Sequence, residues 1–141
     1  MTSPDRRALI LGLAAATLAP RIAPAVAAEL DPLAEHLWVN RLVIVFAQSE
    51  NDPRFRQQMR ELEERREDLE ERDVVILTDT TPGPSRTDTT PLRKKFRPHD
   101  FNVLLVGKDG EVKLRRPAPQ GADQIIRLID RLPLRKQEVG R

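Results

Sequence analysis

The chain has 141 residues, no cysteine, and 24 basic against 22 acidic residues. This length fits one small domain with its own core. The lack of cysteine excludes disulfides, thiolate metal ligands and all reactions that use a cysteine nucleophile. We therefore expect neither thiol–disulfide reductase nor cysteine peroxidase activity.

The first 27 residues have the pattern of a cleavable export signal. Arg6 and Arg7 form a positive start, an apolar run of 12 residues follows, and Ala25-Val26-Ala27 fits a small-residue cleavage site. The apolar run is too short for a stable membrane anchor. We expect a signal peptide over residues 1–27 and a periplasmic or secreted bacterial domain over residues 28–141, with no transmembrane span.

The mature domain is formally neutral, but its charges are divided along the chain. Residues 28–85 hold 7 basic and 14 acidic side chains, and residues 86–141 hold 14 basic and 7 acidic ones. Such asymmetry suits an anionic partner or head-to-tail self-association. The alternative, which we favour, is that the two halves pair within one domain.

The first half of the mature domain has the pattern of a strand–helix–strand unit. Leu42–Phe46 and Val74–Leu77 are short apolar runs typical of strands buried on both faces. Asp52 and Pro53 are a typical cap and first residue of the helix between them. Short connections then predict a parallel strand pair with a right-handed crossover. The apolar stripe of the helix consists of Phe55, Met59, Leu62 and Leu69.

A loop and a short helix are predicted next. Thr80 to Pro91 is rich in Thr and Pro, contains Gly83 and predicts a loop, either a lid over a site or a slack insertion. Thr90-Pro91 fits the start of a short helix. In that helix we expect Leu92 and Phe96 to face inward and Arg93, Lys94 and Lys95 to face outward.

The last third predicts a hairpin and a closing helix. Val103–Val106 and Val112–Leu114 flank the turn Gly107–Gly110. Apolar residues at helical spacing run from Ala122 to Leu132, and Pro133 ends the pattern. The predicted fold is α/β, a four-stranded mixed sheet in the order βαβ, short helix, ββα, with helices on both faces.

Four stretches also carry a family resemblance: Trp38–Arg41, Val45–Arg54, Leu105–Arg115 and Ile129–Glu138. With the element order, they resemble the thioredoxin fold. The more specific resemblance is to a peroxiredoxin-like family of unknown function, found in bacterial exported proteins and in vertebrate sushi-repeat and coiled-coil matrix proteins. The resemblance implies a thioredoxin-like domain and leaves its activity open.

The stretch where redox thioredoxins carry their reactive cysteines reads Ala47-Gln48-Ser49-Glu50-Asn51 here. Ser49 has no base adjacent in sequence, and a serine hydroxyl without a base is a poor nucleophile. We interpret this stretch as turn and capping residues and assign no catalytic residue. His36 and His99 lack metal-ligand spacing, no nucleic-acid motif is present, and we assign no metal and no cofactor.

A binding surface is the remaining candidate site. Its residues are Trp38, Asn40, Arg41, Lys108, Lys113, Arg115 and Arg116. The four basic residues of the predicted hairpin could dock an unknown envelope protein, an acidic surface or a second copy, or simply protect a sheet edge from aggregation. We expect Trp38 to pack against the start of the sheet; an exposed recognition anchor is the alternative.

The sequence thus favours an exported, non-catalytic, thioredoxin-like binding or accessory module of the cell envelope. One alternative is a cysteine-independent enzyme that uses Ser49 with Arg41 or Arg54. The other is a scaffold that self-associates through its oppositely charged halves.

Export predicts a mature protein that lacks the first 27 or 28 residues, measurable as intact mass in the envelope fraction. Recovery of the chain with Met1 would contradict the prediction. Arg6-Arg7 followed by Leu9 and Ile10 also resembles a twin-arginine signal. If blocking that route leaves the mature form unchanged, general secretion is the route.

Overall fold

The structure is a computed structural model that describes residues 31–82 and 89–140. The predicted signal segment and the middle of the predicted loop lie outside the described residues. Among the described residues, no helix is long and apolar enough to cross a membrane.

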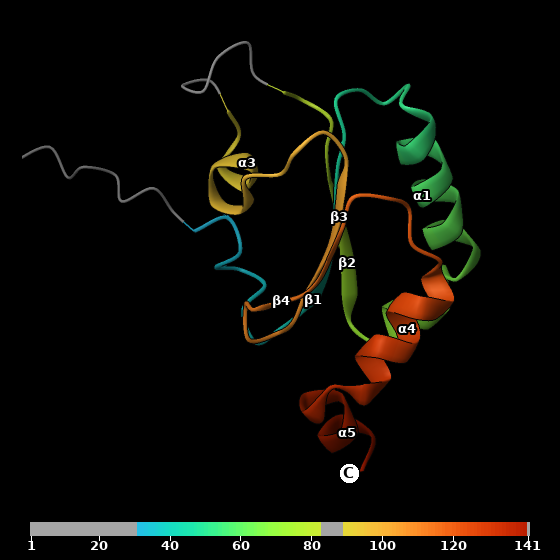
Figure 1. The fold of residues 1–141 in the computed structure, drawn as a ribbon. Helices are drawn as coiled ribbons and strands as arrows, with labels where there is room; N and C mark the ends of the chain where they lie inside the picture. Colours follow the sequence, from blue (N-terminus) through green and yellow to red (C-terminus); the bar gives the residue numbers. More distant parts are fainter. Residues whose placement is uncertain (1–30, 83–88, 141) are drawn as a thin grey trace, which may run out of the picture.

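Four strands form one mixed sheet in the order β2-β1-β3-β4 (Figure 1). Strand β1 (Arg41–Phe46) lies parallel to β2 (Val74–Asp79) and antiparallel to β3 (Asn102–Val106), which forms a hairpin with β4 (Val112–Arg116). All six residues of β1 are buried, as expected of a central strand with both faces covered. The predicted sheet and its parallel pair are confirmed.

Helices cover both faces of the sheet. Helices α1 (Pro53–Glu64) and α4 (Ala122–Arg131) lie on one face and α3 (Pro91–Phe96) on the other. Helix α5 (Pro133–Val139) lies beyond the end of the sheet where β1 and β2 begin (Figure 1).

The first helical segment is interrupted, which the sequence pattern did not indicate. Arg65 leaves helical geometry, with φ −123° and ψ 30°, and separates α1 from α2 (Arg66–Glu71). Leu69 of α2 still packs in the same core as Leu62 of α1. The break therefore redirects the chain into β2 without loss of the apolar stripe.

Each face of the sheet has its own apolar core, because side chains alternate along β1. Val43 and Val45 pack against α1 and α4, together with Phe101 and Ile129. On the opposite face, the core contains Leu33, Leu42, Ile44, Phe46, Phe96, Leu104 and Val106.

Two predicted orientations are wrong. Arg93 faces inward and is buried, because its guanidinium donates hydrogen bonds to Asp79 Oδ1 (3.0 Å) and to the main-chain oxygen of Ala47 (2.7 Å). Trp38 does not pack against the sheet: its backbone has φ 64°, and the residue is 65 % exposed.

A fully buried glutamine joins α1 to the segment between β4 and α4. Gln58 Nε2 donates to the oxygen of Gln120 at 2.9 Å, and Gln58 Oε1 accepts from the Gln120 N–H at 2.7 Å. Both polar groups of the Gln120 backbone thereby find a partner away from water.

Replacing Gln58 with leucine should lower the free energy of unfolding by about 1–3 kcal/mol, because both Gln120 groups lose their partner. Denaturant unfolding measures the loss. The neighbouring exposed Gln57 provides the control, since Gln57→Leu should change stability by less than about 0.5 kcal/mol. Equal stability of the two variants would contradict the role of the buried amide.

Candidate functional site

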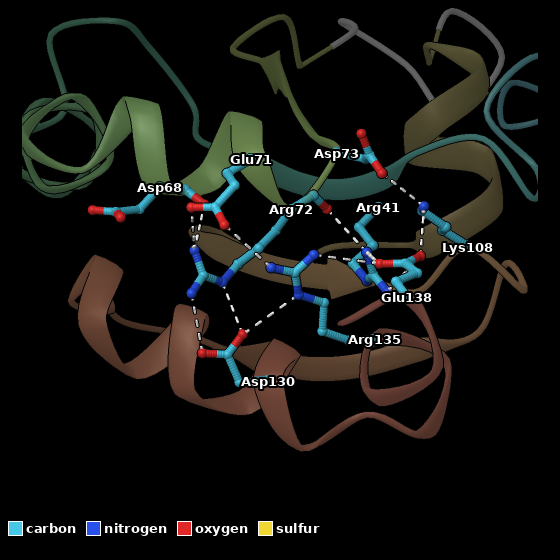
Figure 2. Close-up of polar contacts among 9 residues, drawn as sticks. All are labelled: Arg41, Asp68, Glu71, Arg72, Asp73, Lys108, Asp130, Arg135 and Glu138. Carbon is cyan, nitrogen blue, oxygen red and sulfur yellow. Dashed lines mark hydrogen bonds and ion pairs between the residues drawn. The ribbon is translucent and has the colours of Figure 1, made fainter. Parts of the chain in front are cut away.

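The start of the central strand carries a buried cation. Arg41 is the first residue of β1 and is 1 % exposed. Its Nη1 donates to the main-chain oxygen of Arg72 (2.9 Å), and both Nη atoms contact the Glu138 carboxylate at 3.2 and 3.3 Å (Figure 2). A guanidinium removed from water needs such a carboxylate, so β1 and α5 depend on each other here.

Lys108, from the turn between β3 and β4, contacts the same carboxylate. Its ammonium donates to Glu138 (2.7 Å) and to Asp73 (2.8 Å). Burial would lower the pKa of Lys108, but the bonds to Asp73 and Glu138 outweigh burial and raise it. Burial would likewise raise the pKa of Glu138, yet the bonds from Lys108 and Arg41 outweigh it and hold this pKa below its ordinary value.

The ion pairs continue along α2, α4 and α5. Arg72 binds Asp130 through two bonds of 2.8 and 3.2 Å, which lower the pKa of this aspartate. Arg135 lies within 4 Å of carboxylates on all three helices, namely Glu71, Asp130 and Glu138. We call this set the basal network (Figure 2): Arg41, Glu71, Arg72, Asp73, Lys108, Asp130, Arg135 and Glu138.

Trp38 lies beside the basal network at a hollow of about 270 Å³. Its backbone N–H donates to the Lys108 oxygen at 2.7 Å, which fixes the left-handed turn at this residue. The hollow is also lined by Arg41, Lys108, Lys113, Leu132, Pro133 and Leu134. An exposed tryptophan thus shares a hollow with apolar residues at the start of α5 and with three basic residues.

The candidate binding residues from the sequence divide into groups. Trp38, Arg41, Lys108 and Lys113 meet at the hollow, whereas Asn40 Oδ1 faces His36 Nδ1 at 3.2 Å. The two remaining residues lie elsewhere on β4 and bond main-chain oxygens: Arg115 contacts Phe96 (2.9 Å) and Arg116 contacts Arg115 (3.1 Å). The predicted hairpin patch is therefore not one continuous surface.

Lysines at the hollow are balanced by carboxylates of the same chain. Lys113 contacts Asp109 at 2.8 Å and Glu111 at 3.1 Å. The bond to Asp109 raises the pKa of Lys113 despite partial burial. A partner at the hollow would thus encounter lysines that are already paired with carboxylates, not unpaired positive charges.

The opposite end of β1 leads into the stretch where redox thioredoxins carry cysteine. Ser49 Oγ accepts a bond from the Asn51 N–H (3.1 Å), and Asp52 caps α1 through the Arg54 N–H (2.9 Å), as predicted. Arg54 pairs with Asp52 and with Asp100 at 2.7 and 2.8 Å. Hydrogen bonds from Arg54 hold the pKa of Asp52 below its ordinary value.

No catalytic pair follows from these contacts. Arg41 begins β1 and Ser49 follows its end, so about 3.3 Å per residue places them at opposite ends of the sheet. Ser49 has no titratable base bonded to it among the residues that the structure describes. Within the same ranges, no cluster of three or more His, Asp or Glu side chains is arranged to hold a metal ion.

The sequence profile of a family described as "Domain of unknown function (DUF4174)" matches residues 32–138. The chain belongs to this DUF4174 family. A curated relative, coiled-coil domain-containing protein 80 of Danio rerio, is 30 % identical over 134 residues, covering 77 % of this chain and 16 % of that protein. The chain therefore spans about a sixth of this relative's length.

Solved structures of peroxiredoxins have a similar fold. Reduced 2-Cys peroxiredoxin of Plasmodium vivax superposes with a TM-score of 0.55 and 15 % identity, covering 75 % of this chain and 83 % of that one. Peroxiredoxin 1a of Plasmodium yoelii gives 0.52 and 18 %, with 75 % and 79 % covered. The thioredoxin-like fold and the predicted family resemblance are confirmed.

Five members of the basal network come from three of the stretches that carry the family resemblance: Arg41, Lys108, Asp130, Arg135 and Glu138. No motif in the sequence assigns a role to Glu138 or Asp130. Both acidic residues lie near basic residues in a stretch that carries the family resemblance, and this was the only sign of a role. Their spacing along the chain could not indicate which basic side chain each one contacts.

Replacing Glu138 with glutamine should lower the free energy of unfolding by about 2–3 kcal/mol at neutral pH, because Arg41 stays buried without its counter-ion. The native pKa of Glu138 lies below its ordinary value of 4.5. Its stabilising effect is therefore fully present above that value and is lost as pH falls toward the native pKa. The stability gap between wild type and variant should stay constant above about pH 6 and narrow below about pH 4.5.

Urea unfolding at a series of pH values measures this gap. Glu64, exposed on α1, supplies the control variant Glu64→Gln, which should differ from wild type by less than about 0.5 kcal/mol. The stabilising role of Glu138 would be contradicted if wild type and Glu138→Gln had the same free energy of unfolding at neutral pH. It would also be contradicted if their difference grew as the pH falls.

Proposed function

We propose that this chain is an exported, non-catalytic binding or accessory module of the bacterial cell envelope. The signal-like pattern of the first 27 residues supports export. The absence of cysteine and the place of Ser49 in a turn, where its hydroxyl accepts a bond from Asn51, support a function without thiol or serine chemistry.

Trp38 is the observation that carries a binding function. Tryptophan is a large apolar side chain that is enriched among the dominant residues of protein interfaces. Here 65 % of the residue is exposed, and its backbone occupies a left-handed conformation that is costly for a non-glycine residue. A chain that keeps tryptophan in such a position places the indole where a partner can cover it.

The chemistry of the hollow suggests what the partner presents. Leu132, Pro133 and Leu134 offer an apolar floor beside the indole. We propose a protein segment that places an apolar side chain against Trp38 and these residues.

Charge-driven self-association receives less support from the contacts. The acidic and basic halves of the domain pair with each other inside one molecule, for example Asp73 with Lys108 and Asp79 with Arg93. Much of the charge that would hold two copies together is therefore already neutralised.

A photo-crosslinking residue at position 38 should yield one discrete adduct in envelope fractions of producing cells. The same residue in place of Arg60, exposed on α1, is the control and should yield none. An adduct of twice the chain's mass would identify a second copy and favour the scaffold, and no adduct from position 38 would contradict the binding function.

The partner found by crosslinking should bind Trp38→Asn at least tenfold more weakly, because the indole contact is lost. Asparagine tolerates positive φ, so the variant should keep its melting temperature. An unchanged affinity would exclude Trp38 as the anchor.

A further inference from the structure

A second hollow, of about 620 Å³, lies on the α3 side of the sheet, distinct from the hollow at Trp38. It is lined by Thr89, Arg93, Lys94, Arg97, Pro98 and His99. It adjoins the carboxyl end of the parallel β1–β2 pair, since Arg93 bonds Asp79 at the end of β2 and Ala47 just after β1. Open α/β sheets commonly bind ligands outside the carboxyl ends of their strands.

Arg97 is an unusual residue in this lining. It follows the last turn of α3 with φ 47° and ψ 56°, the left-handed conformation that glycine adopts most easily. Pro98 explains why the helix ends here, since a proline disfavours the right-handed helical conformation in the residue before it. It does not explain why arginine occupies a position that suits glycine at this helix end.

The guanidinium of Arg97 is also free among the described residues. Arg97 is exposed, and no hydrogen bond or ion pair joins its side chain to that part of the molecule. In contrast, Asp79 neutralises the buried Arg93, and Asp100 is engaged by Arg54. These two carboxylates are thus committed to other cations.

The backbone around the hollow is held in place by two side chains. Arg115 Nη2 donates to the Phe96 oxygen at 2.9 Å, which ties β4 to the end of α3. Asn102 Oδ1 accepts from the His99 N–H at 3.2 Å, and its Nδ2 donates to the Phe101 oxygen at 2.8 Å. Arg97 and His99 therefore project from a fixed loop, with the charge of Arg115 on the adjoining strand.

We propose that this second hollow binds a small ligand through a phosphate or sulfate group, with Arg97 as its principal contact. The planar guanidinium offers paired donors that match two oxygens of such a group. His99 supplies a further donor from the same loop, and the charge of Arg115 on the adjoining strand attracts the anion. This site is independent of the proposed partner surface at Trp38.

The test is an NMR titration of the purified mature protein with inorganic phosphate and with inorganic sulfate. Sodium chloride keeps the ionic strength constant, because general screening of exposed charge must not be mistaken for binding. We expect saturable shifts of the Arg97 and His99 backbone amides with at least one of the two ions. Shifts that chloride reproduces, or that do not saturate, would overturn the proposal.

Arg97→Gly separates binding from folding. Glycine removes the guanidinium and accepts the positive φ without penalty, so the melting temperature should be unchanged or higher while affinity falls at least fivefold. Arg60→Gln removes an exposed arginine from the opposite face of the sheet and should bind as wild type does. Unchanged affinity of Arg97→Gly would overturn the proposal.

Vesicles that contain an anionic phospholipid distinguish a free ligand from a lipid headgroup. Saturable binding of free phosphate or sulfate, with no association with vesicles, supports a small ligand. If the protein associates with vesicles but does not respond to the free ions, the proposal of a small ligand is overturned and the hollow binds a membrane surface instead.

Discussion

Arg41 places a guanidinium at the first position of the central strand, where it has almost no contact with water. A buried cation without a carboxylate is far costlier than one with a partner. The partner, Glu138, lies 97 positions later in the chain and belongs to a short helix with no buried residue of its own. The pair helps to hold α5, whose residues also pair with Lys108, Glu71 and Asp130 and line the Trp38 hollow.

The two ends of the sheet are built in different ways. At the end where β1 and β2 begin, several cations share several carboxylates. The network joins strand β1, helices α2, α4 and α5, and the turns that follow α2 and β3. At the other end, one buried pair, Arg93 with Asp79, closes the space after the parallel strands. In thioredoxin enzymes the second end supplies the reactive group. Here its polar side chains cap helices and pair with each other, and Arg97 projects from the loop that follows.

Much of the fold follows from local patterns in the sequence. Continuous apolar runs predict buried strands, and Asp52-Pro53 and Thr90-Pro91 predict helix starts, because these patterns act over a few residues. The inward turn of Arg93 could not be predicted, since its partner Asp79 lies 14 residues earlier across a loop. Trp38 was expected to pack against the start of the sheet, but its backbone is left-handed and the residue is 65 % exposed.

The candidate site was only partly predictable for the same reason. Trp38, Arg41, Lys108 and Lys113 were identified by residue type, and the fold brings them together. Arg115 is only two residues from Lys113, yet it contacts α3. The pairing of β3 with β4 shifts register between Leu105 and Val106, and such an irregularity redirects nearby side chains.

The central claim is that Arg41 and Glu138 stabilise the domain as a pair. A double-mutant cycle with Arg41→Met, Glu138→Gln and the combined variant tests it most directly, using free energies of unfolding at neutral pH. The account predicts a coupling energy of at least about 1 kcal/mol, with the double variant losing less than the two single losses combined. Losses that add to within about 0.5 kcal/mol would show that the two residues act independently and would contradict the claim.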